Sequence, residues 1–460
     1  MKHKEITQRK TKILATLGPS SNTIKKIIEL SKAGANTFRL NCSHLSEKDL
    51  RDYVRKIRRA EKILNKPIGI LVDLQGPKIR IGKVNGGESF INKDNFFVLD
   101  LKKEIGNSRR VTLPHKKIFS SIKKGQLILL DDGKIHLKVT SVRANEIKTR
   151  VLQGGYLKSN KGINLPQTNI KTSALSSIDK KFAIIAVQEG VDWIALSFVQ
   201  KPNDIKELRK ICLNKVSIMA KIEKPTALDY INEIADLADG IMIARGDLGV
   251  ELPIESVPGW QKKIIRVARV KGRPVVVSTQ MLESMTSSLT PTRAEVSDVA
   301  NAVFEGADAI MLSAESASGD YPVETVKMMN KIAINIEKDS NYNDILSSQL
   351  EDTPDTTPDA IAVAAKTLAD ELSAPIIVCY TESGSTGIKV SRVRPSQTIL
   401  TITPVVQTAR KLSLAWGVLC FLQKDESDLE HMIKLTKKTV KKSGLAIAGD
   451  KVVITAGLPL

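Results

Sequence analysis

The sequence contains few aromatic residues, few cysteines and no long apolar run. Only 4% of its 460 residues are Phe, Trp or Tyr, which argues against nucleic-acid recognition by aromatic stacking. Its four cysteines stand far apart without a CxxC pair, so we expect buried thiols in a reducing compartment rather than a cysteine metal site. Neither a membrane span nor the apolar core of a signal peptide is present. These absences predict a cytoplasmic protein that makes no contact with membranes.

Two common nucleotide-binding motifs are also absent. The sequence has neither the GxxxxGK[ST] pattern of a P-loop nor GxGxxG, so nucleotide binding by those folds is not indicated. Asp and Glu number 50 against 70 Lys and Arg, a formal net charge of +20. The lysines are spread along the chain with acids between them, which favours attraction of anionic metabolites over specific nucleic-acid binding. A basic RNA-binding protein stays open as the non-enzyme alternative.

The chain is long enough for two or three domains, and most of it alternates between strand-like and helix-like segments. Short apolar runs suited to buried strands are each followed by a segment with helical spacing. We count eight such strands, which begin near Thr11, Asn36, Pro67, Asp192, Ser217, Gly240, Pro274 and Asp308. Eight regular βα units predict a (β/α)₈ (TIM) barrel of the α/β class, with an open doubly wound sheet as the alternative.

Two further domains are predicted. Residues 77–172 lose the helical periodicity and show short alternating runs with turn sequences such as Asn-Gly-Gly, which predict an inserted small β-barrel placed to act as a lid. The catalytic barrel is then assigned to residues 1–76 and 173–347. After a polar, proline-containing linker, residues 355–460 show the pattern of a C-terminal α/β domain.

The stretch from Ser217 to Glu251 carries the strongest chemical signal. It holds two strand segments that end in charged residues, with a helical segment between them. Lys221 and Glu223 are two positions apart, so on a strand both side chains point to the same side. Asp247 follows the next strand, 24 positions after Glu223, which brings two carboxylates and an ammonium together on neighbouring parallel strands. Such carboxylates repel unless a cation joins them, and oxygen ligands favour Mg²⁺ or Mn²⁺.

Polar residues follow most of the other predicted strands as well. In a barrel the carboxyl ends of the strands meet at the active face. Paired carboxylates with a lysine and arginines suggest a metal-assisted reaction on a phosphorylated or carboxylated anion. The candidates are Arg39, Asn41, Ser43, His44, Asp73, Ser197, Lys221, Glu223, Arg245, Asp247, Thr279, Ser313 and Glu315, with Arg80 just inside the insertion.

Nine motifs spread over almost the whole chain give a family resemblance. They are TKILATLGPSS, FRLNCSH, VDLQGPKIR, KGINLP, IMAKIEKP, IMIARGDLGVELP, STQMLESM, PTRAEVSDVANAV and IMLSAESASGDYP. On these motifs the chain resembles the pyruvate kinases. The resemblance implies Mg²⁺-dependent transfer of phosphate from phosphoenolpyruvate to ADP, giving pyruvate and ATP in the last step of glycolysis, by a homotetramer. Mutases, lyases and aldolases that act on pyruvate enolates in similar barrels are the alternative enzyme class, and KGINLP and the insertion disfavour them.

The resemblance also implies roles for individual residues. Glu223 and Asp247 hold Mg²⁺, while Lys221 stabilises charge on the transferring phosphoryl group and the enolate. Residues implied around the substrate are Arg39, Arg80, Ser197, Lys221, Ala244, Arg245, Gly246, Asp247 and Thr279. Those implied near the nucleotide, which brings a second Mg²⁺, are Pro19, Asn41, His44, Arg80 and Lys161. Those implied near the enolate carbon are Thr279, Ser313 and Glu315. For His44 a structural role is equally open.

One departure from the common family pattern concerns potassium. Many pyruvate kinases hold K⁺ with residues of the Asn41, Ser43, Asp73 and Leu74 type and have Glu at the position of Lys78. The combination in this chain resembles the K⁺-independent branch, because the ammonium of Lys78 can supply the missing positive charge. We therefore predict activity without K⁺, with a solvent-facing lysine as the alternative.

The second departure lies in the C-terminal domain. The loop Thr381–Gly387 has the composition of a phosphate-binding nest before a helix, and an ordinary strand-to-helix turn is an equal alternative. The family usually continues past residues 451–456 with another loop and strand, whereas this sequence stops at Leu460. We therefore expect no activation of the fructose-bisphosphate type, and an unprotected edge in the final sheet.

Overall fold

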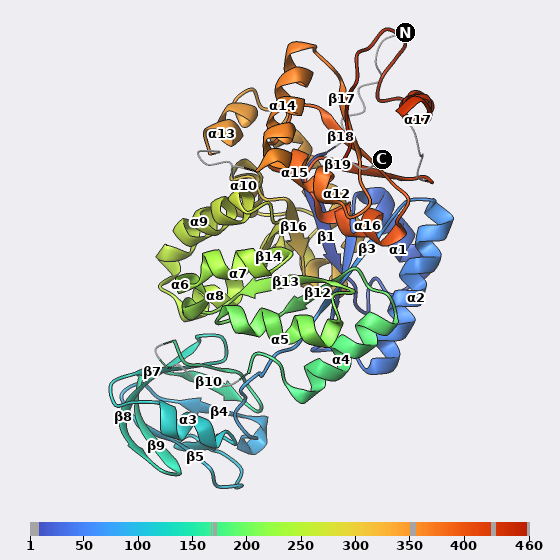
Figure 1. The fold of residues 1–460 in the computed structure, drawn as a ribbon. Helices are drawn as coiled ribbons and strands as arrows, with labels where there is room; N and C mark the ends of the chain where they lie inside the picture. The colour runs from blue at the N-terminus through green and yellow to red at the C-terminus, as the bar shows by residue number, and fades with distance from the viewer. Residues whose placement is uncertain (1–8, 167, 169–172, 350–355, 425–428, 458–460) are drawn as a thin grey trace.

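The computed structural model describes residues 9–166, 168, 173–349, 356–424 and 429–457 (Figure 1). Eight parallel strands pair in the order β1-β16-β15-β14-β13-β12-β3-β2 and close into a barrel, because β1 pairs with both β2 and β16. They are β1 (Lys12–Thr16), β2 (Thr37–Asn41), β3 (Gly69–Asp73), β12 (Trp193–Leu196), β13 (Ser217–Ile222), β14 (Gly240–Ala244), β15 (Val275–Ser278) and β16 (Ala309–Leu312). The predicted (β/α)₈ barrel is confirmed, and the open doubly wound sheet is wrong.

Helices cover the outside of the barrel, and several begin at reciprocal capping pairs. Before α2, the Ser46 hydroxyl accepts a hydrogen bond from the Asp49 N–H and the Asp49 carboxylate accepts one from the Ser46 N–H. The same pattern begins α4 and α10, so three starts are specified by local sequence. The barrel helices are α1 (Ile24–Ala33), α2 (Glu47–Leu64), α4 (Ser177–Gln188), α5 (Pro202–Cys212), α6 (Pro225–Asp229), α7 (Ile231–Leu237), α8 (Arg245–Glu251), α9 (Val257–Val270), α10 (Arg293–Phe304), α11 (Ala314–Ala317), α12 (Pro322–Glu337) and α13 (Tyr342–Ser348), with 3₁₀ turns η2 (Ile254–Ser256) and η3 (Glu283–Thr286).

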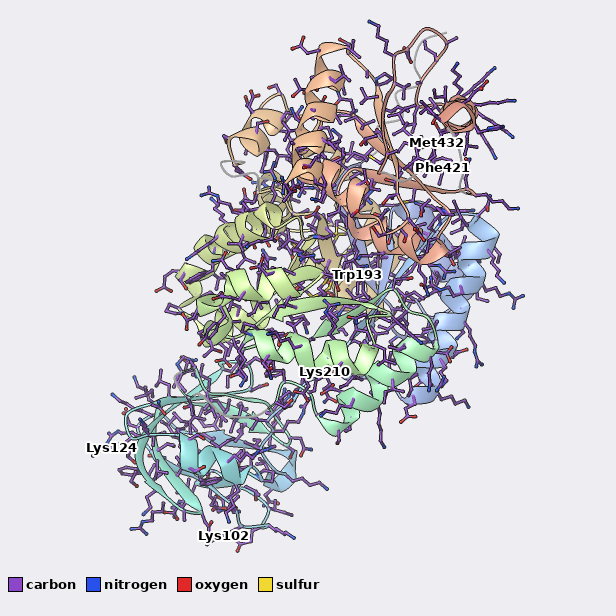
Figure 2. All side chains as sticks on the ribbon, viewed as in Figure 1. Lys102, Lys124, Trp193, Lys210, Phe421 and Met432 are labelled. Atoms are coloured by element: carbon purple, nitrogen blue, oxygen red, sulfur yellow. The ribbon has the colours of Figure 1, made fainter. Side chains whose placement is uncertain are left out.

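Alternate strand residues fill the barrel interior, and the C-terminal domain closes one end of it. Leu14, Leu71, Trp193 and other strand residues form one apolar cluster with Leu414. Trp193, which Figure 2 shows within the barrel, donates its indole N–H to the Lys411 carbonyl at 3.3 Å. Trp193 is the first residue of β12. The C-terminal domain therefore covers the end of the barrel where its strands begin. The carboxyl ends are left for the site.

Between β3 and α4 the chain forms the insert, a β-rich body that stands apart from the barrel in Figure 1. A six-stranded sheet, β11-β7-β8-β9-β5-β6, and a two-stranded sheet, β10-β4, share one apolar core. The two connecting segments lie side by side, joined by a bridge between Arg80 and Gly162. Lys102 and Lys124 are exposed on the insert (Figure 2). Its elements are η1 (Asn85–Gly87), β4 (Glu88–Ile91), β5 (Phe96–Asp100), β6 (Arg110–Thr112), α3 (Lys116–Ser121), β7 (Leu127–Leu130), β8 (Ile135–Arg143), β9 (Glu146–Gln153), β10 (Gly155–Lys158) and β11 (Ile163–Asn164).

The C-terminal domain is a parallel sheet, β19-β18-β17-β20, with an apolar cluster on each face. Its last strand, β20, lies at one edge of the described sheet. Its elements are α14 (Thr357–Glu371), β17 (Ile376–Tyr380), α15 (Ser385–Arg392), β18 (Thr398–Thr403), α16 (Val406–Lys411), η4 (Leu412–Leu414), β19 (Val418–Leu422), α17 (Leu429–Ser443) and β20 (Val453–Thr455). Within the described residues, every helix falls short of the length and apolar character that a bilayer span requires.

Candidate active site

Lys221 and Glu223 lie at the carboxyl end of β13, where their spacing predicts them. The buried Lys221 ammonium contacts the Glu223 carboxylate at 2.8 Å, the Asp73 carboxylate at 3.1 Å and the Ser197 hydroxyl at 2.7 Å. Burial alone would lower the pKa of Lys221, but the charges of Asp73 and Glu223 outweigh it and raise that pKa. The ammonium therefore stays charged at physiological pH.

Asp73 joins this ammonium to Arg39. One Asp73 oxygen contacts Lys221, and the other accepts from Nε and Nη2 of Arg39, both at 2.7 Å. Arg39 Nη1 also donates to the Thr16 hydroxyl at 3.1 Å. Burial would raise the pKa of Asp73, but Lys221 and Arg39 outweigh it and hold the pKa below its ordinary value. Arg39, Asp73, Lys221 and Glu223 thus form one charged network across the strand ends.

Glu223 is buried, and the nearby Asp247 is exposed. Burial raises the pKa of Glu223, the Lys221 ammonium opposes the rise, and the charge of Asp247 adds to it. The Phe198 N–H holds one Glu223 oxygen at 2.9 Å. Two repelling carboxylates fit a divalent cation that takes its other ligands from water or substrate. The part of the chain that the structure describes has no group of three or more His, Cys, Asp or Glu arranged for a metal.

Thr279 follows β15 and faces the start of α8. Its φ of 72° is unusual for a β-branched residue. The Thr279 hydroxyl accepts a hydrogen bond from the Gly246 N–H at 2.7 Å and donates to the Ser278 carbonyl at 2.6 Å. The hydrogen bond from Gly246 holds the hydroxyl beside the residue that precedes Asp247.

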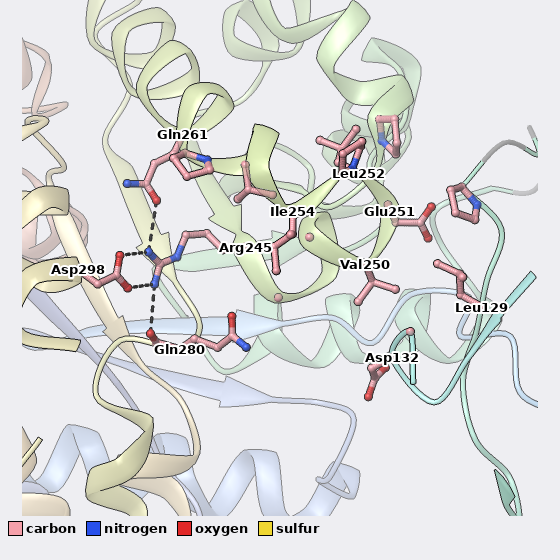
Figure 3. A pocket seen from close by; sticks show the side chains of 18 of the residues that line it. Leu129, Asp132, Arg245, Val250, Glu251, Leu252, Ile254, Gln261, Gln280 and Asp298 are labelled. Carbon is pink, nitrogen blue, oxygen red and sulfur yellow. Dashed lines mark hydrogen bonds and ion pairs between the residues drawn. The ribbon is translucent and has the colours of Figure 1, made fainter. Parts of the chain in front are cut away.

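The Arg245 side chain is clamped by Asp298 of α10 (Figure 3). Its two terminal nitrogens contact the two Asp298 oxygens at 2.6 and 2.7 Å, and one of them also donates to the Thr279 carbonyl at 2.6 Å. The sequence predicts Arg245 at the substrate. The structure directs its guanidinium to Asp298, so a contact with substrate would come from the backbone at this position.

A cleft of about 1080 Å³ lies beside this clamp, between α8 and the insert. Figure 3 shows Leu129 and Asp132 of the insert across from Val250 and Glu251 of α8. Gly246 belongs to its lining, whereas no residue of the charged network does among those described. The cleft therefore runs along the outer side of α8, next to the candidate active site rather than through it.

Ser313 and Glu315 lie at the carboxyl end of β16, beside the strand that precedes Thr279. The Glu315 carboxylate accepts from the backbone N–H groups of Ser313 at 2.6 Å and Leu282 at 3.4 Å. Burial raises the pKa of Glu315, and its backbone hydrogen bonds oppose that rise. The three residues implied near the enolate carbon thus come from neighbouring strand ends.

The residues implied near the nucleotide are divided between the insert and the barrel. Arg80 is exposed on the insert and donates to a backbone carbonyl there at 3.0 Å, while Lys161 pairs with Asp131 at 2.7 Å. Pro19 and His44 are exposed in loops after β1 and β2. Each insert cation is thus held within the insert in this arrangement, and neither is paired with the charged network.

The predicted monovalent-cation position lies at the ends of β2 and β3. The Asn41 side-chain oxygen accepts from the Ser43 N–H at 3.1 Å, and the Leu74 carbonyl accepts from a serine hydroxyl at 2.7 Å. The Asp73 carboxylate is occupied by the charged network. Lys78 is exposed where the chain enters the insert.

Three residues that shape the site were not predicted. Thr16 ends β1, so the same polar-strand-end signal that indicated Arg39 applied to it. Phe198 has a φ of 58° and gives its N–H to a site carboxylate. Asp298 lies within a helix. Neither Phe198 nor Asp298 has a local sequence signal, because each acts through a tertiary contact.

Comparisons with known proteins agree with this geometry. The chain matches the family profile described as pyruvate kinase, barrel domain, over residues 8–326, and the one described as pyruvate kinase, alpha/beta domain, over residues 359–460. It is 48% identical over 451 residues to a pyruvate kinase of Methylorubrum extorquens (98% of this chain, 94% of the relative) and 45% identical over 454 residues to one of Agrobacterium vitis (98% and 96%). A crystal structure of a pyruvate kinase from Cryptosporidium parvum superposes with a TM-score of 0.94 at 33% identity, covering 98% of this chain and 94% of that one.

Proposed function

The chain belongs to the pyruvate kinase family and is a phosphotransferase, and on that premise we propose that it transfers the phosphoryl group of phosphoenolpyruvate to ADP, giving pyruvate and ATP. The observation that carries the proposal is the buried Lys221 ammonium held among Asp73, Glu223 and Ser197. A cation that stays charged at a barrel's carboxyl end stabilises negative charge developing on a phosphoryl group and on an enolate. Arg39, joined to the same network, would contact the phosphoryl oxygens.

We propose that Glu223 and Asp247 hold Mg²⁺, with Mn²⁺ as a substitute. When bound, the ion supplies Lewis-acid stabilisation of charge on the reacting oxygens. The chain orients Glu223 through the Phe198 N–H and Lys221. Ser197 and the backbone of residues 244–247 would then face the substrate carboxylate.

We propose that Thr279 presents its hydroxyl to the enolate carbon, with Ser313 and Glu315 completing a proton path. The Thr279 hydroxyl is already oriented by Gly246 and Ser278. Burial raises the pKa of Glu315, so this carboxyl holds its proton to a higher pH than an ordinary carboxyl does. These features support proton delivery from this side of the site.

We propose that the insert acts as a lid. Arg80 forms the bridge that joins its two connecting segments, and Lys161 precedes the bridge partner Gly162, so a swing about those segments would carry both cations toward the barrel. Pro19, Asn41 and His44 would meet the nucleotide from the barrel side. We also propose K⁺-independent activity, in which closure of the insert brings the ammonium of Lys78, exposed at the same connection, to the monovalent-cation position. We further propose that the protein is cytoplasmic and forms a homotetramer. Light scattering, which measures the molar mass in solution, tests the tetramer directly.

A coupled lactate dehydrogenase assay with phosphoenolpyruvate, ADP and Mg²⁺, run with and without K⁺, tests the function. We expect pyruvate formation that requires ADP, which separates a kinase from a mutase or lyase. Lys221→Met should abolish most of it, whereas Lys210→Met, at an exposed position on α5, should not. Salt-sensitive RNA binding without any turnover would instead support the RNA-binding alternative.

A further inference from the structure

Three arginines are buried where the barrel meets the C-terminal domain. Arg269 lies near the end of α9, Arg392 ends α15, and Arg394 follows it. Their exposed fractions are 4%, 6% and 4%. Arginine is rarely this buried unless it is paired, so each guanidinium needs an account of its partners.

Arg392 and Arg394 each have an acidic partner. Arg394 contacts Asp308 at 2.9 Å and the Gly306 carbonyl at 2.8 Å. Arg392 contacts Asp359 at 3.2 Å. Nevertheless Nε and Nη2 of Arg392 and Nε of Arg394 are buried without an acceptor among the described residues.

Within the residues that the structure describes, Arg269 has no carboxylate partner. Its Nε donates to the Arg392 carbonyl at 3.3 Å, while Nη1 and Nη2 are buried and find no acceptor in the described part of the chain. Burial lowers the pKa of Arg269 to about 9, and the nearby charge of Arg394 adds to the effect. At neutral pH the group is therefore still a cation.

The two carboxylates at this junction are already shared. Asp308 also accepts backbone N–H groups from Val275 at 3.0 Å and Trp416 at 3.2 Å. Asp359 also pairs with Lys389 at 3.0 Å. Among the described side chains at this junction the arginines outnumber the carboxylates, and leaving a buried charge uncompensated is strongly unfavourable. A further negative charge would relieve this imbalance, which a water molecule cannot do.

A cavity of about 10 Å³ opens among these side chains. We call it the arginine cavity; it is lined by Arg269, Gly272, Arg273, Pro274, Asp308, Ile388, Ser391, Arg392, Arg394 and Ala415. A space of this size holds one water molecule or one monatomic ion.

We propose that the arginine cavity binds a chloride-sized inorganic monoanion. The ion would accept hydrogen bonds from the terminal nitrogens of Arg269 and from the unpartnered nitrogens of Arg392 and Arg394. It would thereby tie α9 of the barrel to α15 of the C-terminal domain. The site is distinct from the charged network at the opposite, carboxyl end of the barrel, and it is independent of the phosphotransfer reaction.

Anomalous diffraction from crystals of the full chain grown with bromide in place of chloride tests the site directly. We expect an anomalous peak within hydrogen-bonding distance of the Arg269 guanidinium in the wild type, and its loss in Arg269→Met. A wild-type crystal with water alone in the arginine cavity would overturn the proposal. So would a peak that persists unchanged in the variant.

Thermal unfolding at constant ionic strength gives a second readout, in which chloride is exchanged for the bulkier gluconate. We expect chloride to raise the wild-type Tm by about 2 °C, the effect of a ligand roughly tenfold above its Kd. Arg269→Met should abolish that increment. Arg266→Met, at an exposed position of the same helix, should keep it.

An equal chloride effect in all three proteins would contradict the proposal.

Discussion

The Glu251 carboxylate, at the end of α8, accepts a hydrogen bond from the Asn164 side chain of the insert at 2.8 Å. The same Glu251 oxygen is paired with the ammonium of Lys224, the residue after Glu223. Glu251 is buried, so both contacts form away from water, where charge-assisted hydrogen bonds are strong. The last strand of the insert is thus tied to the helix that carries Asp247 and to the strand end that carries Glu223.

Asn164→Ala removes one of these two bonds and leaves the ion pair of Glu251 intact. We expect the insert to sample more orientations, and the KM for ADP to rise roughly tenfold or more, because a hydrogen bond to a charged group contributes about 1.5–3 kcal/mol. The reason is that the insert positions Arg80 and Lys161. Steady-state kinetics with ADP and phosphoenolpyruvate varied in turn measure this. Asn145→Ala, in an exposed turn of the insert, is the control. A loss confined to kcat would count against the tether.

Asp73 stands between two cations, and Asp73→Asn tests that position. When the negative charge of Asp73 is removed, the cations of Arg39 and Lys221 repel each other in a buried site. We expect the free energy of unfolding to fall by about 3–5 kcal/mol, as for other broken buried ion pairs, together with a large loss in kcat/KM for phosphoenolpyruvate. Urea unfolding and the coupled assay measure the two effects. Asp52→Asn removes only a surface pair with Lys56 and should change stability by less than about 1 kcal/mol. Equal stability losses in both variants would disprove the role of the network.

Local periodicity explains which parts of this site could be predicted from sequence. The two-residue strand period places Lys221 and Glu223 on one side, and the length of one βα repeat places Asp247 beside them. The same rules locate Asp73 at a strand end but say nothing of the charge it meets. Its contact with Lys221 depends on the strand order β13-β12-β3, which brings together segments distant in sequence. Asp298, which contacts Arg245, lies in the middle of another helix. It could not be predicted for the same reason.

Asp192 precedes β12 and has an unusual carboxyl environment. Because of it, we expect the free energy of unfolding to fall as the pH rises through mildly acidic values. One of its oxygens accepts from Arg58 and from the Ile70 N–H, both at 2.8 Å, and the other finds no donor among the described residues. Burial raises the pKa of Asp192 to about 6, even with Arg58 opposing the rise. The folded protein therefore binds more protons than the unfolded chain between about pH 4 and 6. Over that interval the free energy of unfolding should drop by roughly 2–3 kcal/mol and then level off.

Asp192→Asn keeps an acceptor oxygen for Arg58 and Ile70 but cannot titrate. Urea unfolding of both proteins at about pH 4.5 and 7 measures the effect. We expect the wild type to lose stability relative to the variant on going to the higher pH. If the free energies of unfolding of the wild type and the variant differ by the same amount at both pH values, the pKa of Asp192 is not raised on folding.

Lys78→Glu tests the predicted source of the monovalent charge. If the Lys78 ammonium replaces a potassium ion, the variant should lose at least roughly tenfold in activity in K⁺-free buffer, since one charge near the phosphoryl group is reversed. Added K⁺ should restore most of that loss, while the wild type should respond little. Lys83→Glu makes the same charge change at an exposed position further into the insert and should gain no K⁺ dependence. Many-fold activation of the wild type by K⁺ would contradict the prediction. Identical behaviour of Lys78→Glu and Lys83→Glu would also contradict it. In either case Lys78 is an ordinary solvent-facing lysine and does not replace the potassium ion.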